Sequence, residues 1–493
     1  MSTDYGIIIA LQLMLLAAVY ILRDPKLLIP CVILGLPFEY VSAEAVASLG
    51  ESGISGAIRT LLNPGKAAIL ATVVIAVFRS RHNPRQLIPN SAIVLPLTAL
   101  LAVVFLGVLW ADTLVPTNGV LIMPMYVAFV WAAPTFIEDR RDLERIVFAF
   151  FAAAAVLSVV AIAQRALGVF QWRSILVQSD AYSYRSNAFF ADPNNLARFL
   201  AITMALATGF ILTTGPRRMT ALVAAPVLGI SAIALVATAS RSGWLGMLLA
   251  CFVMVLVAPI HRYTKKRLTF GAFGGLALLL TLVFMQGGTD AERVKSLTSG
   301  IELLGQRSFL IRGGWEMWKD NPLIGVGSGN YQKTLVVSYL WTLPWWAKTT
   351  LSHTAFISIL AELGIVGVGM FVLLLFRTGV ACVTSYFAST SRYSRLMIGW
   401  CGAALIEILF QSQSEGRLLE EPFLYVVLAI LVSLELGAGQ RGPDPIVATE
   451  PETARELPRE HAPAPLPGRQ RAPVPVGGAA TTSNIALESR TEP

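Results

Sequence analysis

Long apolar runs separated by short polar stretches occupy most of the chain as far as residue 436. Most of these runs cover roughly 17–22 residues, close to the ~20 that an α-helix needs to cross the hydrocarbon core of a membrane. We place about 13 spans, of which the third is short and is also compatible with a re-entrant segment. The predicted spans cover residues 5–22, 27–49, 66–78, 91–109, 120–137, 146–167, 195–212, 220–239, 243–260, 268–285, 354–376, 396–411 and 422–436. The pattern predicts an all-α, polytopic integral membrane protein with about 12–13 transmembrane helices.

Composition agrees with this class. The chain is 55% hydrophobic and 14% charged, whereas a soluble domain carries about 25% charged residues. The N-terminal residues lack the basic segment of a signal peptide, so we expect the first span to be retained. The four cysteines show neither disulfide nor metal-ligand spacing, and we assign them no chemistry.

Basic residues concentrate in alternate short loops, which predicts the orientation of the chain in the membrane. One set of loops holds Arg23, Lys26, Arg79, Arg81, Arg85, Arg140, Arg141, Arg145, Arg217, Arg218, Arg262, Lys265, Lys266, Arg267, Arg377, Arg392 and Arg395. The short loops between them hold only Arg59, Lys66, Arg241 and Arg417. The positive-inside rule makes the first set cytoplasmic, with the N-terminus outside and the C-terminus inside. The net charge of +8 then reflects loops beside anionic lipid rather than a nucleic-acid partner.

Two long loops face outward in this topology, over residues 168–194 and 286–352. After residue 436 the composition changes to a proline-rich stretch with few aromatic residues, which does not bury a core. We therefore expect a transmembrane domain over residues 1–437, with a long periplasmic loop at 286–352. A disordered cytoplasmic tail is expected over residues 438–493.

His353 is the only histidine of the four that this topology places on the outer face. The order Ser352-His353-Thr354 directly precedes an apolar helical run, which predicts Ser352 as N-cap and His353 in the first turn. A helix N-terminus disfavours the imidazolium, and a neutral imidazole is the form that a general base needs. The alternative is a histidine that only hydrogen-bonds at the interface.

Arginines on the outer side form the second candidate group. Arg185, Arg241, Arg307 and Arg312 map to outer loops, and Arg198 maps to the outer end of a span. Because positive-inside statistics disfavour this placement, we expect these arginines to have partners. The guanidinium fork matches phosphate oxygens bidentately and stays charged when partly desolvated. The alternative for each is a side chain that extends to lipid headgroups.

Other features of the predicted outer loops indicate local structure rather than catalysis. No Asp-x-Asp pair occurs in the outer loops, so a magnesium or manganese site is not indicated. The segment FFADPNNLARFL predicts a turn and a helix start, in which Asn194 or Asn195 is a candidate glycan contact. The glycine-rich residues 321–331 lack a P-loop lysine and predict a tight turn. Trp341, with the tryptophans just after it, suits a segment that lies at the membrane interface.

These pieces resemble those of a known family. FFADPNNLA, TASRSGWLG, an R-x4-R-x2-W segment followed by NPLIGVGSGNY, and SHTAFISILAELGIVG occur in this order between residues 185 and 367. The chain resembles the O-antigen ligase and polymerase superfamily of bacterial inner-membrane proteins. The resemblance implies a metal-independent glycosyltransferase that moves a glycan from an undecaprenyl-diphosphate donor to an acceptor at the periplasmic face. It implies that His353 activates the acceptor hydroxyl and that Arg241 and Arg312 hold the diphosphate, with Arg185 and Arg307 as further candidates.

We therefore expect an inverting transfer without cofactor or metal, in the inner membrane. The expected partners are the lipid-linked donor, the bilayer and an acceptor that is either lipid A-core or a growing polysaccharide, and no nucleic acid. Ligation and polymerisation share this chemistry, and the sequence does not show the acceptor. The family's ligases usually have about 12 spans, so the extra span and the tail leave the subfamily open.

The rival class is a transporter, which would pair ionisable groups near the midplane. Glu362 and Glu407 are the main acids within spans, and neither has a basic partner in register.

Overall fold

A computed structural model describes residues 23–39, 63–82, 88–111, 118–169, 185–214, 219–260, 301–344, 352, 354–414, 416 and 418–439. All of these lie in one compact unit, Met1–Ile446, and a second unit covers Val447–Pro493. The predicted spans 5–22 and 268–285 lie outside the described residues. The same is true of most of the span 27–49 and of nearly all of the predicted tail.

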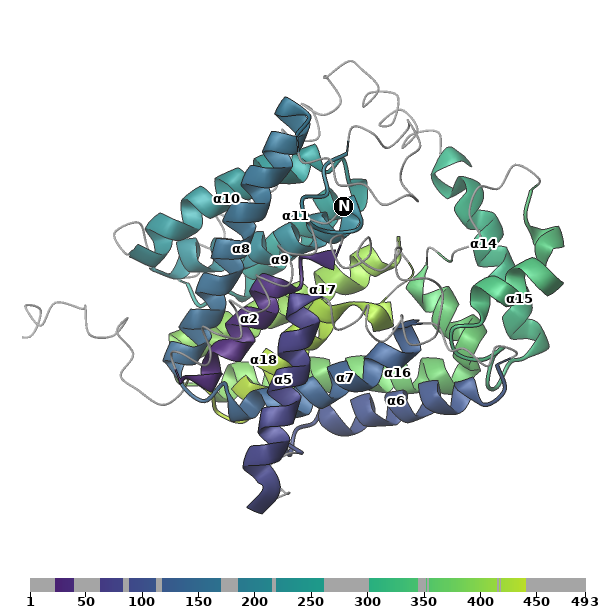
Figure 1. Ribbon diagram of the computed structural model, residues 1–493, viewed down its shortest axis with the longest axis horizontal. Helices are drawn as coiled ribbons and strands as arrows, with labels where there is room; N and C mark the ends of the chain where they lie inside the picture. Colours follow the sequence, from purple (N-terminus) through teal and green to yellow (C-terminus); the bar gives the residue numbers. More distant parts are fainter. Residues whose placement is uncertain are drawn as a thin grey trace, which may run out of the picture. The chain divides into compact units, whose positions relative to one another are not determined.

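The described part of the chain is helical and contains no strand, which confirms the all-α prediction (Figure 1). The helices are α2 (Leu28–Gly35), α5 (Pro64–Arg79), α6 (Val94–Val108), α7 (Asn118–Ala132), α8 (Arg140–Leu167), α9 (Pro193–Thr214), α10 (Met219–Ala237), α11 (Arg241–Val257), α14 (Ile301–Asp320), α15 (Tyr331–Ser338), α16 (Ala355–Ala388), α17 (Arg392–Ser412) and α18 (Pro422–Glu435). Every predicted span within the described residues coincides with a helix. By length and composition, α8, α9, α16 and α17 are able to cross a membrane, and several shorter helices are also apolar.

Two helices extend more than four residues beyond the predicted spans. Helix α8 begins at Arg140, six residues before the first apolar residue of the predicted span, because Asp139 and Asp142 form a capping box there. Helix α16 continues past Phe376 to Ala388. Arg377 therefore lies within a helix, and the prediction of a loop from this residue was wrong. The residues after Arg377 contain no proline and remain mostly apolar, so nothing local ends the helix there.

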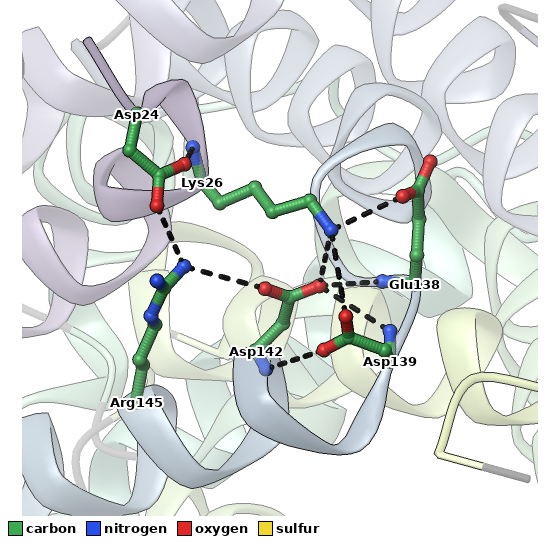
Figure 2. Close-up of polar contacts among 6 residues, drawn as sticks. All are labelled: Asp24, Lys26, Glu138, Asp139, Asp142 and Arg145. Carbon is green, nitrogen blue, oxygen red and sulfur yellow. Dashed lines mark hydrogen bonds and ion pairs between the residues drawn. The ribbon is translucent and has the colours of Figure 1, made fainter. Parts of the chain in front are cut away.

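A charged network joins the start of α2 to the start of α8 (Figure 2). The ammonium of Lys26 lies 2.8 Å from a carboxylate oxygen of Asp142 and 3.1 Å from one of Glu138. The guanidinium of Arg145 lies 2.9 Å from a carboxylate oxygen of Asp24. Asp142 is buried, with 4% of its side chain exposed, so its charge depends on these partners. The network ties the two helix starts together at one end of the bundle.

Other basic residues of the predicted cytoplasmic loops pack onto aromatic rings at helix ends. The guanidinium of Arg140 lies 4.4 Å from the ring centroid of Tyr393, at the start of α17. The guanidinium of Arg79 lies 5.3 Å from the ring centroid of Phe136, just before α8. We call the end of the bundle that holds Lys26, Arg79, Arg140 and Arg145 the basic end. Helix α8 runs from it to the opposite end.

Helices α9 and α11 pack against each other in parallel. Asn194 contacts Ser240 at their first turns, with 2.8 Å between the two side-chain oxygens. Thr208 contacts Cys251 further along, with 3.6 Å between oxygen and sulfur. Helix α10 connects them and runs the other way. Both N-termini therefore lie at one end, opposite the basic end, and we call it the Arg185 end.

Helix α16 is interrupted at Gly364, whose φ of +61° and ψ of −160° are not helical. The interruption takes the N–H groups of Ile365 and Val366 away from their usual acceptors four residues earlier. They donate instead to the carbonyls of Pro322 (2.9 Å) and Leu323 (3.2 Å). A residue with a side chain rarely adopts this backbone conformation, which explains the glycine.

The two carbonyl groups of α16 that lose their helical donors at the interruption accept hydrogen bonds from residues 321–331. The carbonyls of Ala361 and Glu362 accept N–H groups from Val326 (2.9 Å) and Gly327 (3.0 Å). The glycine-rich residues 321–331 thus replace two lost helical hydrogen bonds with four new ones. In an apolar surrounding each unsatisfied backbone group would cost several kcal/mol.

Side chains hold this turn on two helices. The carboxylate of Glu362 accepts the N–H groups of Gly329 (3.0 Å) and Tyr331 (3.1 Å). Ser328 donates its N–H (3.1 Å) and its hydroxyl (2.6 Å) to carbonyls near the C-terminal end of α6. The predicted tight turn is confirmed, and it packs where α6 and α16 lie side by side.

Replacing Gly364 tests this account. In Gly364→Ala the new Cβ would lie 2.4 Å from the carbonyl of Leu323, and the backbone strain alone costs about 1–3 kcal/mol. We expect a clearly lower unfolding temperature for the purified protein in detergent. Gly369→Ala is the matched control, because nothing lies within 4 Å of its Cβ and alanine favours a helix by roughly 0.5–1 kcal/mol. Equal unfolding temperatures of the two variants would contradict the account.

The predicted orientation is tested by cysteine labelling. Lys319, on α14, and Thr390, between α16 and α17, are both exposed. We expect Lys319→Cys to react with a membrane-impermeant maleimide in intact spheroplasts. Thr390→Cys should react only after the membrane is permeabilised, because the positive-inside rule puts its loop in the cytoplasm. The reverse labelling would invert the topology.

Candidate functional site at the Arg185 end

Arg185 is held by two elements. Its Nε donates to the carbonyl of Thr238 (2.9 Å), just past the end of α10. Its Nη2 donates to the side-chain oxygen of Asn194 (2.7 Å), in the first turn of α9. A cation at the C-terminus of a helix is favourable, and the planar guanidinium makes both bonds at once. The arginine is therefore held at the junction of α9 and α10.

Asn194 connects four parts of the chain. Its side-chain oxygen accepts from Arg185 and from the hydroxyl of Ser240 (2.8 Å). Its N–H donates to the carboxylate of Asp192 (2.7 Å), which confirms the predicted turn and helix start. Its carbonyl accepts from the side chain of Gln411 (2.8 Å), near the end of α17. Asn194 therefore has a structural role in addition to any contact with a glycan.

Arg241 is the first residue of α11 and its side chain is exposed. Ser240 caps the helix by accepting the N–H of Gly243 (3.2 Å). Ala239, just before, has a φ of +49°, a conformation that costs a non-glycine residue of order 1 kcal/mol or more. The short break predicted between the spans 220–239 and 243–260 is confirmed, and it places Arg241 next to the Ser240–Asn194 contact.

The electrostatics of this end favour an anion. The N-termini of two parallel helices, α9 and α11, meet at the Asn194–Ser240 contact. Each carries roughly half a positive charge from its aligned peptide dipoles, and Arg185 and Arg241 add two full charges. Helix N-termini with arginine beside them are a common arrangement for binding phosphate groups.

Two neighbouring polar residues are used within the fold. The side-chain nitrogen of Asn195 donates to the carboxylate of Glu39 (3.0 Å). Arg198 forms an ion pair with Glu421, the N-cap of α18, and the two side chains are only 3% and 7% exposed. The expected partner of Arg198 is thus an internal carboxylate, and the arginine joins α9 to α18.

His353 lies outside the described residues, but its neighbours correct one prediction. Helix α16 begins at Ala355, with Thr354 at the N-cap position. The expectation that Ser352 caps the helix and that His353 lies in its first turn was therefore wrong. The hydroxyl of Ser352 instead contacts the N–H of Thr354 (3.3 Å) and the hydroxyl of Ser358 (2.6 Å). Ser352 bonds locally to its own segment, so the helix starts two residues later.

The end of α17 links the start of α16 to Asn194. The N–H of Phe356, in the first turn of α16, donates to the side-chain oxygen of Gln413 (3.3 Å). Gln411, two residues before, bonds to Asn194. The residues that follow His353 and the arginine cluster therefore lie at the same end of the bundle. Sequence reasoning missed both glutamines, although the polar run FQSQSEG after an apolar span was a signal.

Arg307 and Arg312 come to this end from another element, α14, and both are exposed. The guanidinium of Arg312 lies 5.6 Å from the ring centroid of Trp341. Helix α14 packs on α15 and α16, and the hydroxyl of Tyr331 donates to the carbonyl of Leu310 (2.6 Å). Burial raises the pKa of Tyr331, and a hydrogen bond with Ser352 opposes that rise. Tyr331 thus joins α15 to α14.

A hydrogen bond therefore joins Arg185 to Asn194 directly, and Arg241 follows Ser240, which bonds to the same asparagine. Arg307 and Arg312 lie on a separate helix, α14, to which Tyr331 is bonded. Within the described part of the chain, which does not include His353, no group of three or more histidine, cysteine, aspartate or glutamate side chains is arranged to hold a metal.

One family model matches the chain. Residues 226–372 match the family described as O-antigen ligase. The match contains Arg241, Arg307, Arg312 and His353, and it begins after Arg185, Asn194 and Asn195. It confirms, over this segment, the resemblance to the O-antigen ligase and polymerase superfamily. Together with the apolar helices it indicates a membrane protein that acts on glycans. No curated protein matches the chain.

Variants of Asn194 test the junction. Asn194→Ala removes the acceptor of two hydrogen bonds, one of them from a charged donor, which is typically worth about 1.5–3 kcal/mol. We expect a lower unfolding temperature in detergent. Asn194→Asp keeps an acceptor for Arg185 and Ser240, so it should unfold close to the wild-type temperature. A wild-type unfolding temperature for Asn194→Ala would show that the junction does not hold α9, α10 and α11 together.

Proposed function

We propose that this protein transfers an oligosaccharide or polysaccharide from an undecaprenyl-diphosphate donor to a hydroxyl of an acceptor glycan, at the periplasmic face of a bacterial inner membrane. The acceptor is lipid A-core in a ligase and a growing polysaccharide, such as an O-antigen or exopolysaccharide, in a polymerase. The observation that carries the proposal is the cluster of Arg185 and Arg241 at two joined helix N-termini. Through the end of α17, this cluster is connected to the start of α16 beside His353.

In this proposal the arginines bind the donor. Arg185 and Arg241, with the N-termini of α9 and α11, hold the diphosphate, and Arg312 and Arg307 approach it from α14. Their positive charge matters most as the bond to the sugar breaks, because negative charge then grows on the diphosphate. Guanidinium groups and helix dipoles supply the countercharge, so no metal is required. Asn194 and Asn195 contact the glycan through amide atoms that the bonds to Arg185, Ser240 and Glu39 do not use.

His353 is the proposed general base. Its neutral imidazole takes the proton from the acceptor hydroxyl while that oxygen attacks the anomeric carbon. The bond from the anomeric carbon to the diphosphate breaks, and the diphosphate leaves with the electron pair. A single displacement of this kind inverts the anomeric configuration. The basic end of the bundle faces the cytoplasm and the Arg185 end faces the periplasm.

Transport is the alternative, and the described contacts of the two span acids do not favour it. A transporter would use an ionisable group that exchanges partners near the midplane. Glu362 is occupied with two backbone N–H groups of the glycine-rich turn. Glu407 is fully buried and packs closely against Gly246 of α11. A Cβ atom at residue 246 would lie only 3.1 Å from a carboxylate oxygen of Glu407. Both acids thus have places in the packing of the helices.

The proposal is tested by separating donor binding from transfer. His353→Ala, in proteoliposomes with lipid-linked donor and acceptor, should lose about 10²–10⁴-fold in transfer, the usual contribution of a general base, and should still bind donor. Arg241→Ala should lose donor binding as well as transfer. Wild-type transfer should rise with pH as the imidazole of His353 loses its proton, because only the neutral form accepts a proton. The assay contains excess chelator, since the proposed mechanism uses no metal.

Three results would overturn parts of this scheme. Near-normal transfer by well-folded His353→Ala would remove the base. Normal donor binding by Arg241→Ala and Arg185→Ala together would remove the diphosphate site. Transfer that the chelator abolishes and magnesium restores would show that a metal takes part.

A further inference from the structure

Large apolar side chains are exposed on the glycine-rich turn and on α15. Leu323 of the turn is 66% exposed and Val337 of α15 is 73% exposed. The short 3-10 turn Leu340–Thr342 adds Trp341, which is 64% exposed. These side chains belong to one continuous stretch of chain that is otherwise well anchored. Such a concentration of exposed apolar residues marks a surface that contacts another apolar phase.

The opposite face of α15 is already used in packing. Tyr331, Leu335 and Tyr339 are buried in a small cluster with Leu310 and Met317 of α14. A helix that faced water on its other side would carry polar residues there. The exposed face of α15 is mixed, because Gln332, Lys333 and Ser338 are exposed along with Val336 and Val337. Only the second half of the helix presents large apolar side chains, as an amphipathic segment at a boundary would.

The exposed residues continue the apolar surface of the membrane-type helices. The turn is bonded to Ile365 and Val366 of α16, and both of these side chains are exposed. It is also bonded to the last turn of α6, where Leu106 and Leu109 are exposed. Apolar side chains on the outside of membrane helices face lipid. The exposed residues of the turn therefore lie beside positions that face lipid.

This turn lies at the Arg185 end. Helix α6 begins next to Glu435, because the hydroxyl of Ser91 bonds to that carboxylate (2.5 Å) at the end of α18. Helix α18 begins at the Arg185 end, where Glu421 pairs with Arg198 of α9. The C-terminal end of α6, and with it the turn, is thus directed away from the basic end.

Polar groups beside the patch suit a membrane interface better than the lipid interior. The guanidinium of Arg312 lies 5.6 Å from the ring centroid of Trp341. Lys333 is exposed on α15. Tryptophan, with basic side chains whose charges reach toward headgroups, is enriched at the boundary between headgroups and acyl chains.

We propose that Leu323, Ile324, Val336, Val337, Leu340 and Trp341 form one lipid-contacting surface, which rests in the interfacial layer of the leaflet at the Arg185 end. Its occupant is phospholipid, because the patch is continuous with the lipid-facing sides of α6 and α16. The contact fixes α14 at headgroup level. Arg312 then lies at the depth where the diphosphate of any lipid-linked substrate would be.

The depth of spin labels in the bilayer tests the surface. The protein, with its four native cysteines replaced by alanine, is labelled at Val337→Cys and reconstituted in vesicles of phosphatidylcholine and phosphatidylglycerol. Val372→Cys, exposed on α16, is the lipid-facing control, and Lys319→Cys is the water-facing control. We expect the label at residue 337 to collide more often with oxygen than with a water-soluble nickel chelate, as at residue 372, and the label at 319 to show the reverse.

Two outcomes would overturn the proposal. A label at residue 337 that behaves like the one at 319 would place the patch in water. A label shielded from both reagents would mean that a protein, such as a second copy of the chain, covers it. If the cysteine-free chain does not fold, Trp341→Phe is compared with the wild type in vesicles of brominated phosphatidylcholine. The proposal requires a smaller quenched share of tryptophan fluorescence in Trp341→Phe, and an unchanged share would contradict it.

Discussion

The fold depends on how a broken helix satisfies its backbone groups in an apolar setting. Gly364 interrupts α16, and the turn over residues 321–331 supplies donors and acceptors on both sides of the break. Glu362 and Ser328 then fasten that turn to α16 and α6. Because unpaired peptide groups are so costly away from water, the break and the turn stabilise each other. Helices α14 and α15 keep their place on the bundle through this contact.

The two ends of the bundle use charge in different ways. At the basic end, Lys26 and Arg145 are paired with Asp24, Glu138 and Asp142, and the network joins helix starts. At the Arg185 end, Arg198 is paired with Glu421, whereas Arg185 contacts the neutral oxygens of Asn194 and Thr238. These hydrogen bonds hold the planar guanidinium of Arg185 in a fixed orientation. An oriented arginine at this end agrees with the proposed anionic substrate.

Parallel packing of α9 and α11 concentrates this positive potential. Two helices joined by an antiparallel third one necessarily start at the same end, so their N-terminal dipoles add. Asn194 and Ser240 lock these starts together, and α17 brings the start of α16 to the same place. The start of α16, which follows His353 in the sequence, therefore lies at the same end of the bundle as the proposed donor site. The exposed face of α15 would keep α14, with its arginines, at the same depth in the membrane.

Sequence alone determined the fold class, the apolar helices of the predicted spans and the helix start at Asp192, because membrane-length apolar runs and turn residues are local signals. It also identified Arg185, Arg241 and Arg312 as charges that required an explanation. It did not predict α14 and α15, which lie within the predicted loop 286–352. Only the tertiary structure decided that Arg198 pairs with Glu421, that Asn194 holds Arg185, and that Gln411 and Gln413 connect two helices. The tertiary structure also showed that α16 starts after His353, and that the turn at residues 321–331 satisfies the backbone groups of the interrupted helix. These features join residues far apart in the chain, and neither hydropathy nor spacing records which distant partner completes a hydrogen bond.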